Sequence, residues 1–217
     1  AYGDLYQWGR LADGHQKRNS GVKNIVSTMN QPGHNDFIIA PNNPYDWRSP
    51  QNDALWQGVD GVNNPCPVGY RLPTESEWEE ERQSWSGENS IGAFDSPLKL
   101  TVPGDRNDDN SLLNEVGSSG FYWSSSVSGT NVKRLYIGGD SAILQNDTRA
   151  HGSSVRCRKD GVSLAIAIQG NGEVVPVGGT FAQGTQVEIT ATPDEYWFFS
   201  EWTGDVPDGA TATDSVL

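Results

Sequence analysis

The richest source of metal-ligand groups in the sequence is the polar segment Asp105–Asn110, which reads Asp-Arg-Asn-Asp-Asp-Asn. Carboxylate and amide oxygens of this kind are the ligands that Ca²⁺ prefers. The spacing does not match the calcium loop of an EF-hand, and a run of Asp and Asn is also typical of a solvated turn. We therefore predict a turn, with calcium as the weaker alternative and no other metal or cofactor.

The three histidines are the other candidates for chemistry, as bases or as zinc ligands. His15 stands alone, and His34 is followed by Asn35 and Asp36. No two histidines have the HxxxH spacing, and none forms a zinc motif with a cysteine. The sequence also lacks a Gly-x-Ser-x-Gly nucleophile turn and a phosphate-binding loop. We predict no catalytic residue and a protein that is not an enzyme.

Composition excludes several classes of protein. The 217 residues contain 15 Lys and Arg against 28 Asp and Glu, which gives a formal charge of −13. Such a charge repels phosphate backbones and anionic membrane surfaces. No apolar run reaches the roughly 18 residues that a transmembrane helix requires, and eight Trp residues are too many for a disordered acidic chain. We expect a folded protein with no nucleic-acid partner and no membrane insertion in this segment.

One helix and many short strands are predicted to position these side chains. Thr74 and Glu77 form a capping box before a helix that runs to Trp85, with Trp78 and Trp85 on one face. Alternating apolar residues predict strands at 98–102, 111–116, 121–126, 132–137, 142–144 and 154–158. The loop-like segment 10–65 contains Trp47 and Trp56, which we expect to anchor it to a core. A helix followed by antiparallel strands is typical of the α+β class.

A change in charge near Lys159–Gly161 predicts a domain boundary. Residues 161–217 contain eight acids and no Lys or Arg, so they carry −8 of the total charge. Their short apolar runs, separated by glycines, predict a small all-β unit with a hairpin turn at Gly170–Gly172. We expect domains at 1–160 and 161–217. The chain lacks an initiator Met and ends where another strand could begin, so we expect a piece of a longer protein.

Four segments of the first domain carry a family resemblance, namely Ala1–Arg10, Asn64–Glu75, Gly120–Ser126 and Arg149–Asp160. In this order they resemble the Fibrobacter succinogenes major paralogous domain, a bacterial family assigned to the C-type-lectin-like fold. The resemblance covers nearly all of residues 1–160. It implies a C-type-lectin-like domain with one main helix and antiparallel sheets.

The segment Arg71–Glu79 is also similar to the helix entry of the formylglycine-generating enzymes, which share this fold. Those enzymes need two reactive cysteines close together, whereas Cys66 and Cys157 are far apart in the sequence. The sugar-binding calcium motifs of true lectins are missing as well, since Gln31-Pro32 is followed by glycine. The resemblance therefore implies a fold and neither of these chemistries.

Residues 164–206 resemble the internalin-type bacterial B repeat, through Gly172–Pro176, Gly184–Pro193 and Phe199–Asp205. In that family such units are stacked as stalks in surface proteins, and the match here stops short of the last strand. The resemblance implies a secreted bacterial protein, either extracellular or at the cell surface. In that compartment we expect a disulfide between Cys66 and Cys157, with two free buried thiols as the alternative.

The family's fold implies a ligand-binding face at Val132–Ser154, just before its final strand. This segment mixes Tyr, Asp, Asn, Arg and Ser, a composition typical of adaptable binding surfaces. An ordinary variable surface would have the same composition. The candidate ligand-binding residues are Lys133, Arg134, Tyr136, Gly139, Asp140, Ile143, Leu144, Asn146, Asp147, Thr148, His151 and Ser153.

We therefore predict a non-enzymatic, adhesin-like protein that presents a variable loop face to a protein or glycan ligand. One alternative is a structural subunit of a surface layer or filament, which would self-assemble through further repeats. The other, less favoured, is an enzyme of the formylglycine-generating or another type.

Overall fold

The computed structural model describes residues 2–182 and 185–204. Contacts between Cα atoms divide the chain into two compact units, Ala1–Arg158 and Lys159–Leu217. Within the described residues, the helices are few and the strands, mostly antiparallel, form several small sheets. This arrangement fits an α+β or largely β class.

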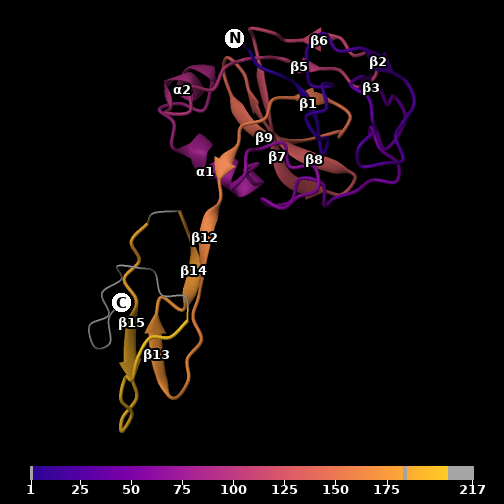
Figure 1. Ribbon diagram of the computed structural model, residues 1–217. Helices are drawn as coiled ribbons and strands as arrows, with labels where there is room; N and C mark the ends of the chain where they lie inside the picture. The colour runs from indigo at the N-terminus through magenta and orange to yellow at the C-terminus, as the bar shows by residue number, and fades with distance from the viewer. Residues whose placement is uncertain (1, 183–184, 205–217) are drawn as a thin grey trace. The chain divides into compact units, whose positions relative to one another are not determined.

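The first unit is built around an antiparallel sheet of order β7-β8-β9 (Figure 1). Its strands are β7 (Gly120–Ser128), β8 (Asn131–Ile137) and β9 (Ala142–Asp147). They confirm the predicted strands in this region, and β9 continues beyond its predicted end at residue 144. The register pairs Leu135 with Tyr122 on one side and with Leu144 on the other.

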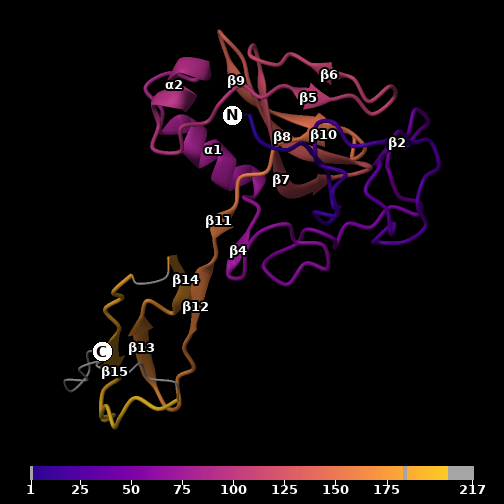
Figure 2. The same cartoon turned by 45° about the horizontal axis from the view of Figure 1, so that its top comes forward.

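Two helices cover one face of this sheet (Figures 1 and 2). The first, α1 (Glu75–Gln83), has the predicted capping box, because the Thr74 side chain accepts from the Glu77 amide and the Glu77 side chain accepts from the Thr74 amide. Trp78 and Trp85 both join a buried cluster with Leu135, in agreement with their predicted position on one face. The second helix, α2 (Ser90–Asp95), was not predicted.

The predicted strand at 98–102 is wrong, because the backbone there bonds to other partners. The Leu100 amide donates to the Ala93 carbonyl of α2, and the Thr101 amide donates to the Tyr122 hydroxyl. The alternating leucines still face inward, since Leu98 and Leu100 belong to the cluster under α1. The apolar residues at alternate positions therefore belong to a loop that folds back over a helix, and not to a strand.

Short strands complete the first unit on the side of the sheet away from the helices (Figure 2). They form an antiparallel sheet of order β1-β10-β5-β6. Its members are β1 (Tyr6–Gln7), β10 (Gly152–Ser153), β5 (Asp105–Arg106) and β6 (Leu113–Asn114). Elsewhere the parallel pair is β2 (Val22–Lys23) with β3 (Phe37–Ile38), and β4 (Tyr70–Arg71) pairs with β11 (Arg158–Lys159).

Two more predicted strands are much shorter in the structure. The stretch 111–116 contributes only β6, and the stretch 154–158 contributes only the start of β11. Ser154 does lie beside β7, where its amide and carbonyl bond to Phe121 and Trp123. The chain then leaves that strand, so the contact remains a single bridge.

Indole groups hold the long irregular segment between β1 and β4. Trp47 and Trp56 are completely buried, which confirms their predicted role as anchors. The Trp47 indole donates to the Trp8 carbonyl at 2.7 Å, and the Trp56 indole donates to the Asn63 carbonyl at 2.8 Å. Each ring therefore buries a large apolar surface while its N–H satisfies a buried carbonyl.

The second unit is all-β within its described residues, as predicted, but its strand pairing differs from the prediction. Its strands are β12 (Gly161–Ala165), β13 (Gly172–Val175), β14 (Gly178–Ala182) and β15 (Thr190–Pro193). β12 pairs with β14, and β13 pairs with β15, all antiparallel. The predicted hairpin at Gly170–Gly172 is wrong, because this turn joins strands of two different sheets.

Candidate functional site

The hairpin β8–β9 places the candidate binding residues on both faces of the sheet. Arg134 and Tyr136 alternate with Lys133 and Leu135 along β8, so the two sets point to opposite sides. The candidates therefore do not form one continuous surface. They divide into a helix-facing set, a buried polar network and an exposed rim.

The helix-facing set supports the fold. Leu144 packs against the cluster that contains Trp78. Lys133 Nζ lies 2.9 Å from Glu75 Oε1 at the start of α1. Asn146, which pairs with Lys133 across the strands, is exposed.

Arg134 is the centre of the buried polar network on the opposite face. Its side chain is about 7% exposed, and its guanidinium forms ion pairs with Asp105 at 3.2 Å and with Asp147. It also donates to Ser153 Oγ at 3.1 Å and lies 4.1 Å from the centre of the Phe121 ring. This one side chain therefore connects β8 to β5, β9 and β10.

His151 extends the network to the turn that follows β5. Its Nδ1 lies 3.0 Å from Asp147 Oδ1 and 2.9 Å from Thr148 Oγ1. The Thr148 hydroxyl donates to Asp108 Oδ2 at 2.7 Å. Five of the predicted site residues thus belong to a partly or fully buried structural network: Arg134, Asp147, Thr148, His151 and Ser153.

The charges of this network shift its pKa values in opposite directions. Burial would lower the pKa of His151, but the hydrogen bond and charge of Asp147 and the charge of Asp108 outweigh it and raise that pKa. Burial raises the pKa of Asp105 despite the neighbouring Arg134. For Asp147 burial is overcome by His151 and Arg134, and its pKa is lowered. The arrangement favours a charged His151–Asp147 pair.

The exposed rim consists of the remaining candidates. Gly139, Asp140 and Ile143 are exposed, and Ile143 has 48% of its surface accessible. Tyr136 is half-buried, with its ring 5.5 Å from that of Phe121. The rim offers a carboxylate and an aliphatic side chain beside a phenol, on a hairpin whose strands the Arg134 network holds together. Such a surface can bind a partner by contact and contains no nucleophile–base pair.

The predicted turn Asp105–Asn110 is shorter in the structure, because Asp105 and Arg106 form β5 and the chain turns at residues 108–110. Several side-chain oxygens of this segment are engaged within the protein. Asp105 pairs with Arg134, Asp108 accepts from Thr148, and Asn107 Oδ1 accepts from the amides of residues 109 and 110. Within residues 2–182 and 185–204, no group of three or more His, Cys, Asp or Glu is arranged to hold a metal ion.

The two remaining histidines also have local structural partners. Buried His15 accepts from the Gln7 amide at its Nε2 and lies 2.7 Å from Asp13 at its Nδ1. Burial lowers the pKa of His15 to about 4, so its ring is neutral at neutral pH. His34 Nδ1 accepts from the Asp36 amide.

The predicted disulfide is present. Cys66 and Cys157 are bonded, with their Cα atoms 5.7 Å apart and a sequence separation of 91. The bond ties the segment before α1 to the end of the first unit. No other cysteine occurs in the chain.

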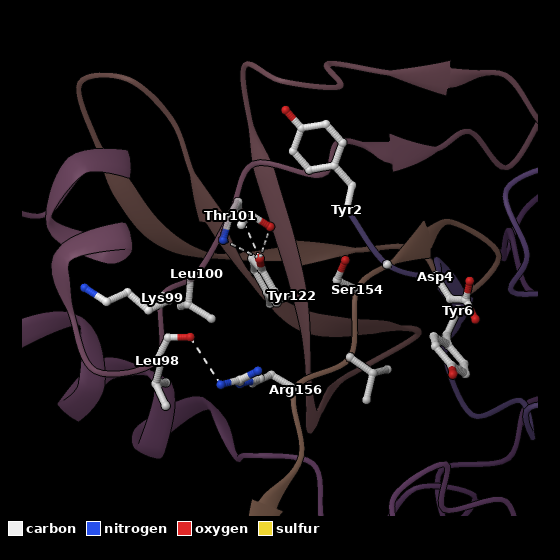
Figure 3. A pocket seen from close by; sticks show the side chains of 12 residues that line it. Tyr2, Asp4, Tyr6, Leu98, Lys99, Leu100, Thr101, Tyr122, Ser154 and Arg156 are labelled. Carbon is white, nitrogen blue, oxygen red and sulfur yellow. Dashed lines mark hydrogen bonds between the residues drawn. The ribbon is translucent and has the colours of Figure 1, made fainter.

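Sequence reasoning missed a pocket of about 500 Å³ in the first unit (Figure 3). Its lining comes from residues 2–4 with Tyr6, residues 98–101, Tyr122 and residues 154–156. No local motif unites these four segments. The sequence therefore has no local signal that could have found the pocket.

Comparison with known families finds a likeness for the second unit. Residues 162–216 match the family model described as Divergent InlB B-repeat domain. This B-repeat unit agrees with the predicted resemblance, and the match reaches almost to the end of the chain. No curated protein and no solved structure matches the chain. The resemblance of residues 1–160 to the Fibrobacter paralogous domain and to the C-type-lectin-like fold therefore stays a prediction.

The B-repeat unit and the disulfide are both compatible with an extracellular or surface protein. None of the helices among the described residues is long and apolar enough to cross a membrane.

Proposed function

We propose that this chain is a non-enzymatic recognition module of a bacterial surface or secreted protein. In this proposal the first unit is a C-type-lectin-like scaffold that binds a protein or glycan ligand, and the B-repeat unit is a spacer. The observation that carries the proposal is the Arg134 network beneath the exposed rim. Buried ion pairs and the Phe121 contact hold β8 and β9 in one arrangement, while Asp140 and Ile143 face solvent.

A preorganised surface of this kind favours binding because less conformational entropy is lost on contact. The rim is also compact, since Tyr136 pairs with Ile143 across the strands and the turn Gly138–Ser141 is closed by a backbone hydrogen bond. The lectin-like assignment rests on the sequence resemblance of residues 1–160.

A binding screen tests this function. The full chain and a double variant with Asp140→Ala and Ile143→Ala are applied to glycan arrays and to a panel of bacterial and host surface proteins. A matched control variant carries the same residue types elsewhere on the exposed surface: Ile25→Ala and Asp60→Ala. We expect one ligand whose binding is lost in the rim variant and kept in the control. Binding that both variants retain would contradict the proposal.

A second candidate function is self-assembly through the B-repeat unit. Tyr196 and Phe198 are 87% and 88% exposed on either side of Trp197, which is 50% exposed. Consecutive exposed aromatics of this size favour association. Sedimentation of the chain over a wide concentration range, with Tyr196→Ser and Phe198→Ser as the variant, tests it. Assembly that disappears in the variant supports this candidate, and a monomer at every concentration excludes it for this chain.

A further inference from the structure

Strand β9 is the last strand of the sheet β7-β8-β9, so one of its edges has no neighbouring strand among the described residues. In an antiparallel pair, opposed residues alternate between those that exchange hydrogen bonds and those whose N–H and C=O groups point away. Ser154 bonds to the backbone of Phe121 and Trp123, so these two residues of β7 point away from β8. The residue between them, Tyr122, therefore exchanges its hydrogen bonds with Leu135 of β8.

The same alternation continues from β8 to β9. Because Leu135 is bonded to β7, the opposed Leu144 directs its N–H and C=O groups to the open edge. Ala142 lies two positions before Leu144, and its carbonyl accepts from Arg82 at 3.3 Å from outside the sheet, as the alternation requires. Asn146 lies two positions after Leu144 and also faces outward. No described residue bonds to the N–H or C=O of Leu144 or Asn146, so this edge presents four unpaired backbone groups.

The edge also lacks the devices that usually protect one. Proteins guard an exposed edge with Lys, Pro or a bulge. Residues 143–146 read Ile-Leu-Gln-Asn, and their pairing with β8 runs without a register shift. Exposed Ile143 and half-buried Tyr136 add apolar surface beside the edge. An extended segment placed here would satisfy the backbone groups and cover this apolar surface.

The charge around the edge indicates what kind of segment fits. A second copy of β9 is disfavoured, because two chains of charge −13 repel each other. Exposed Asp140, in the turn before β9, forms no ion pair within 4 Å of described residues. Acids also outnumber bases at this turn and along the helix-facing side of the hairpin, where the acids are Glu75, Glu79, Glu88 and Asp140 and the bases are Lys133 and Arg82. A partner with basic side chains is therefore favoured.

We propose that β9 binds an extended, basic segment of a protein partner, which adds to the sheet as a fourth strand. The segment exchanges hydrogen bonds with Leu144 and Asn146, places an apolar side chain beside Ile143 and extends Lys or Arg toward Asp140. This inference rests on the proposed function and specifies that its ligand is a protein segment rather than a glycan.

Hydrogen exchange of single amides, followed by NMR on the full chain, tests the strand addition. The probes are the peptide Ac-Thr-Lys-Val-Lys-Val-Lys-Thr-NH2 and its counterpart with Glu in place of Lys. In the free chain, the amides of Leu144 and Asn146 should exchange fast, and those of Ile143 and Gln145 slowly, because only the latter bond to β8. The basic peptide should slow exchange at Leu144 and Asn146 at least about tenfold.

The same titrations compare affinities. The basic peptide should bind at least about tenfold more tightly than the acidic one, and salt raised from about 0.05 to 0.5 M should weaken its binding. Binding of neither peptide, equal binding of both, or fast exchange at Leu144 and Asn146 in the bound chain overturns the proposal. Slow exchange of these two amides in the free chain also overturns it, because the edge would then be occupied already.

A proline variant blocks the edge while keeping the pairing with β8. Asn146→Pro removes an N–H that points away from β8, which is a position where an edge strand tolerates proline. It should weaken binding of the basic peptide by about tenfold. Asn146→Ala keeps the N–H and is the matched control, with unchanged affinity. Slow exchange of the Ile143 amide in both variants confirms that β9 still pairs with β8.

Two results separate this inference from the proposed function. A screened ligand that requires Asp140 and Ile143, but leaves the Leu144 and Asn146 amides unprotected, would support the proposed function and overturn strand addition. Protection of these amides by the basic peptide, when no screened ligand depends on Asp140 and Ile143, would support strand addition and contradict recognition through the rim.

Discussion

Arg134 links β8 to two other segments through carboxylates that are themselves buried. Asp105 and Asp147 are 8% and 11% exposed at their side chains. Arg134→Met keeps an apolar stem over Phe121 but leaves two buried carboxylates without their partner. We expect a loss of about 3–5 kcal/mol in the free energy of unfolding, measured by urea denaturation.

The neighbouring Lys133 provides the control for that measurement. Lys133 and Glu75 pair near the surface, with side chains 22% and 42% exposed. Lys133→Gln should cost at most about 1 kcal/mol. Equal costs for the two substitutions would show that the Arg134 network does not stabilise the fold as described.

His151 makes the same network sensitive to pH. Its pKa is raised in the folded state by Asp147 and Asp108, against the effects of burial and of Arg134. A raised folded pKa adds stability that is fully present below the unfolded value of 6.5 and is lost as the pH rises through the folded pKa. The unfolding free energy should therefore fall on going from about pH 6 to pH 9. In His151→Gln this contribution disappears. Parallel curves of unfolding free energy against pH for the two proteins would contradict the role of His151.

At the scale of elements, α1 begins where local chemistry places it. Glu77 accepts from the Thr74 amide and forms a two-pronged pair with Arg71 at 2.8 and 2.7 Å. The hydrogen bonds from Arg71 are the main cause that lowers the pKa of Glu77 to about 2, with Thr74 and Arg158 contributing. A lowered pKa adds stability that is present above the unfolded value of 4.5 and is lost as the pH falls toward 2.

The substitution Glu77→Gln removes the negative charge of this side chain but keeps its capping hydrogen bond. Glutamine can still accept from the Thr74 amide, as in other capping boxes, but it cannot pair with Arg71 as an anion. We expect a loss of about 1–3 kcal/mol at pH 7, shrinking toward zero as the pH approaches 2. Circular dichroism melts at several pH values measure it. A cost that does not change with pH would show that the ion pair is not its source.

The second helix shows why some elements could not be predicted from the sequence. Only Gly92 and Ala93 of α2 are buried, and Ile91 and Phe94 are exposed, so no apolar stripe marks it. A Cβ added at Gly92 would lie 1.9 Å from the Gly87 carbonyl oxygen. The glycine that reads locally as a helix breaker is thus required by a close backbone approach.

In the candidate site, too, features with a local cause could be predicted from the sequence, whereas features that depend on distant segments could not. The alternation of β8 and β9 is a local pattern, and it predicted both strands. The burial of Arg134, Asp147 and His151 depends on Asp105 and Asp108, which reach them only through the pairing of β5 with β10. Polar residues at alternate positions looked exposed because their partners come from another sheet.

At the scale of the whole molecule, the disulfide closes a loop of most of the first unit. Cys66 and Cys157 are 91 residues apart. A crosslink over that span removes unfolded-state entropy worth about 4–5 kcal/mol in the loop-closure model. Because whole domains are stable by only about 5–15 kcal/mol, we expect reduction to lower the urea midpoint of the first unit strongly.

The double variant Cys66→Ala, Cys157→Ala is the control for reduction. It should have the midpoint of the reduced protein with or without reductant, as followed by fluorescence of the buried tryptophans. If reduction of the parent chain lowers the free energy of unfolding by less than about 1 kcal/mol, the unfolded chain is already constrained without the bond.

The crossed strand pairing of the second unit determines the order in which its strands can pair during synthesis. The pair β12–β14 closes around β13, and the pair β13–β15 closes around β14. During synthesis, β13 therefore waits for its partner until Pro193 has emerged, although β12 and β14 are already complete. Because each pair of strands closes a loop that contains a strand of the other pair, the contact order is raised and folding is slowed. The same overlap couples the two sheets in one cooperative folding step. In a nascent chain arrested before residue 190, the edge of β13 would be unpaired and could pair with a strand of another chain.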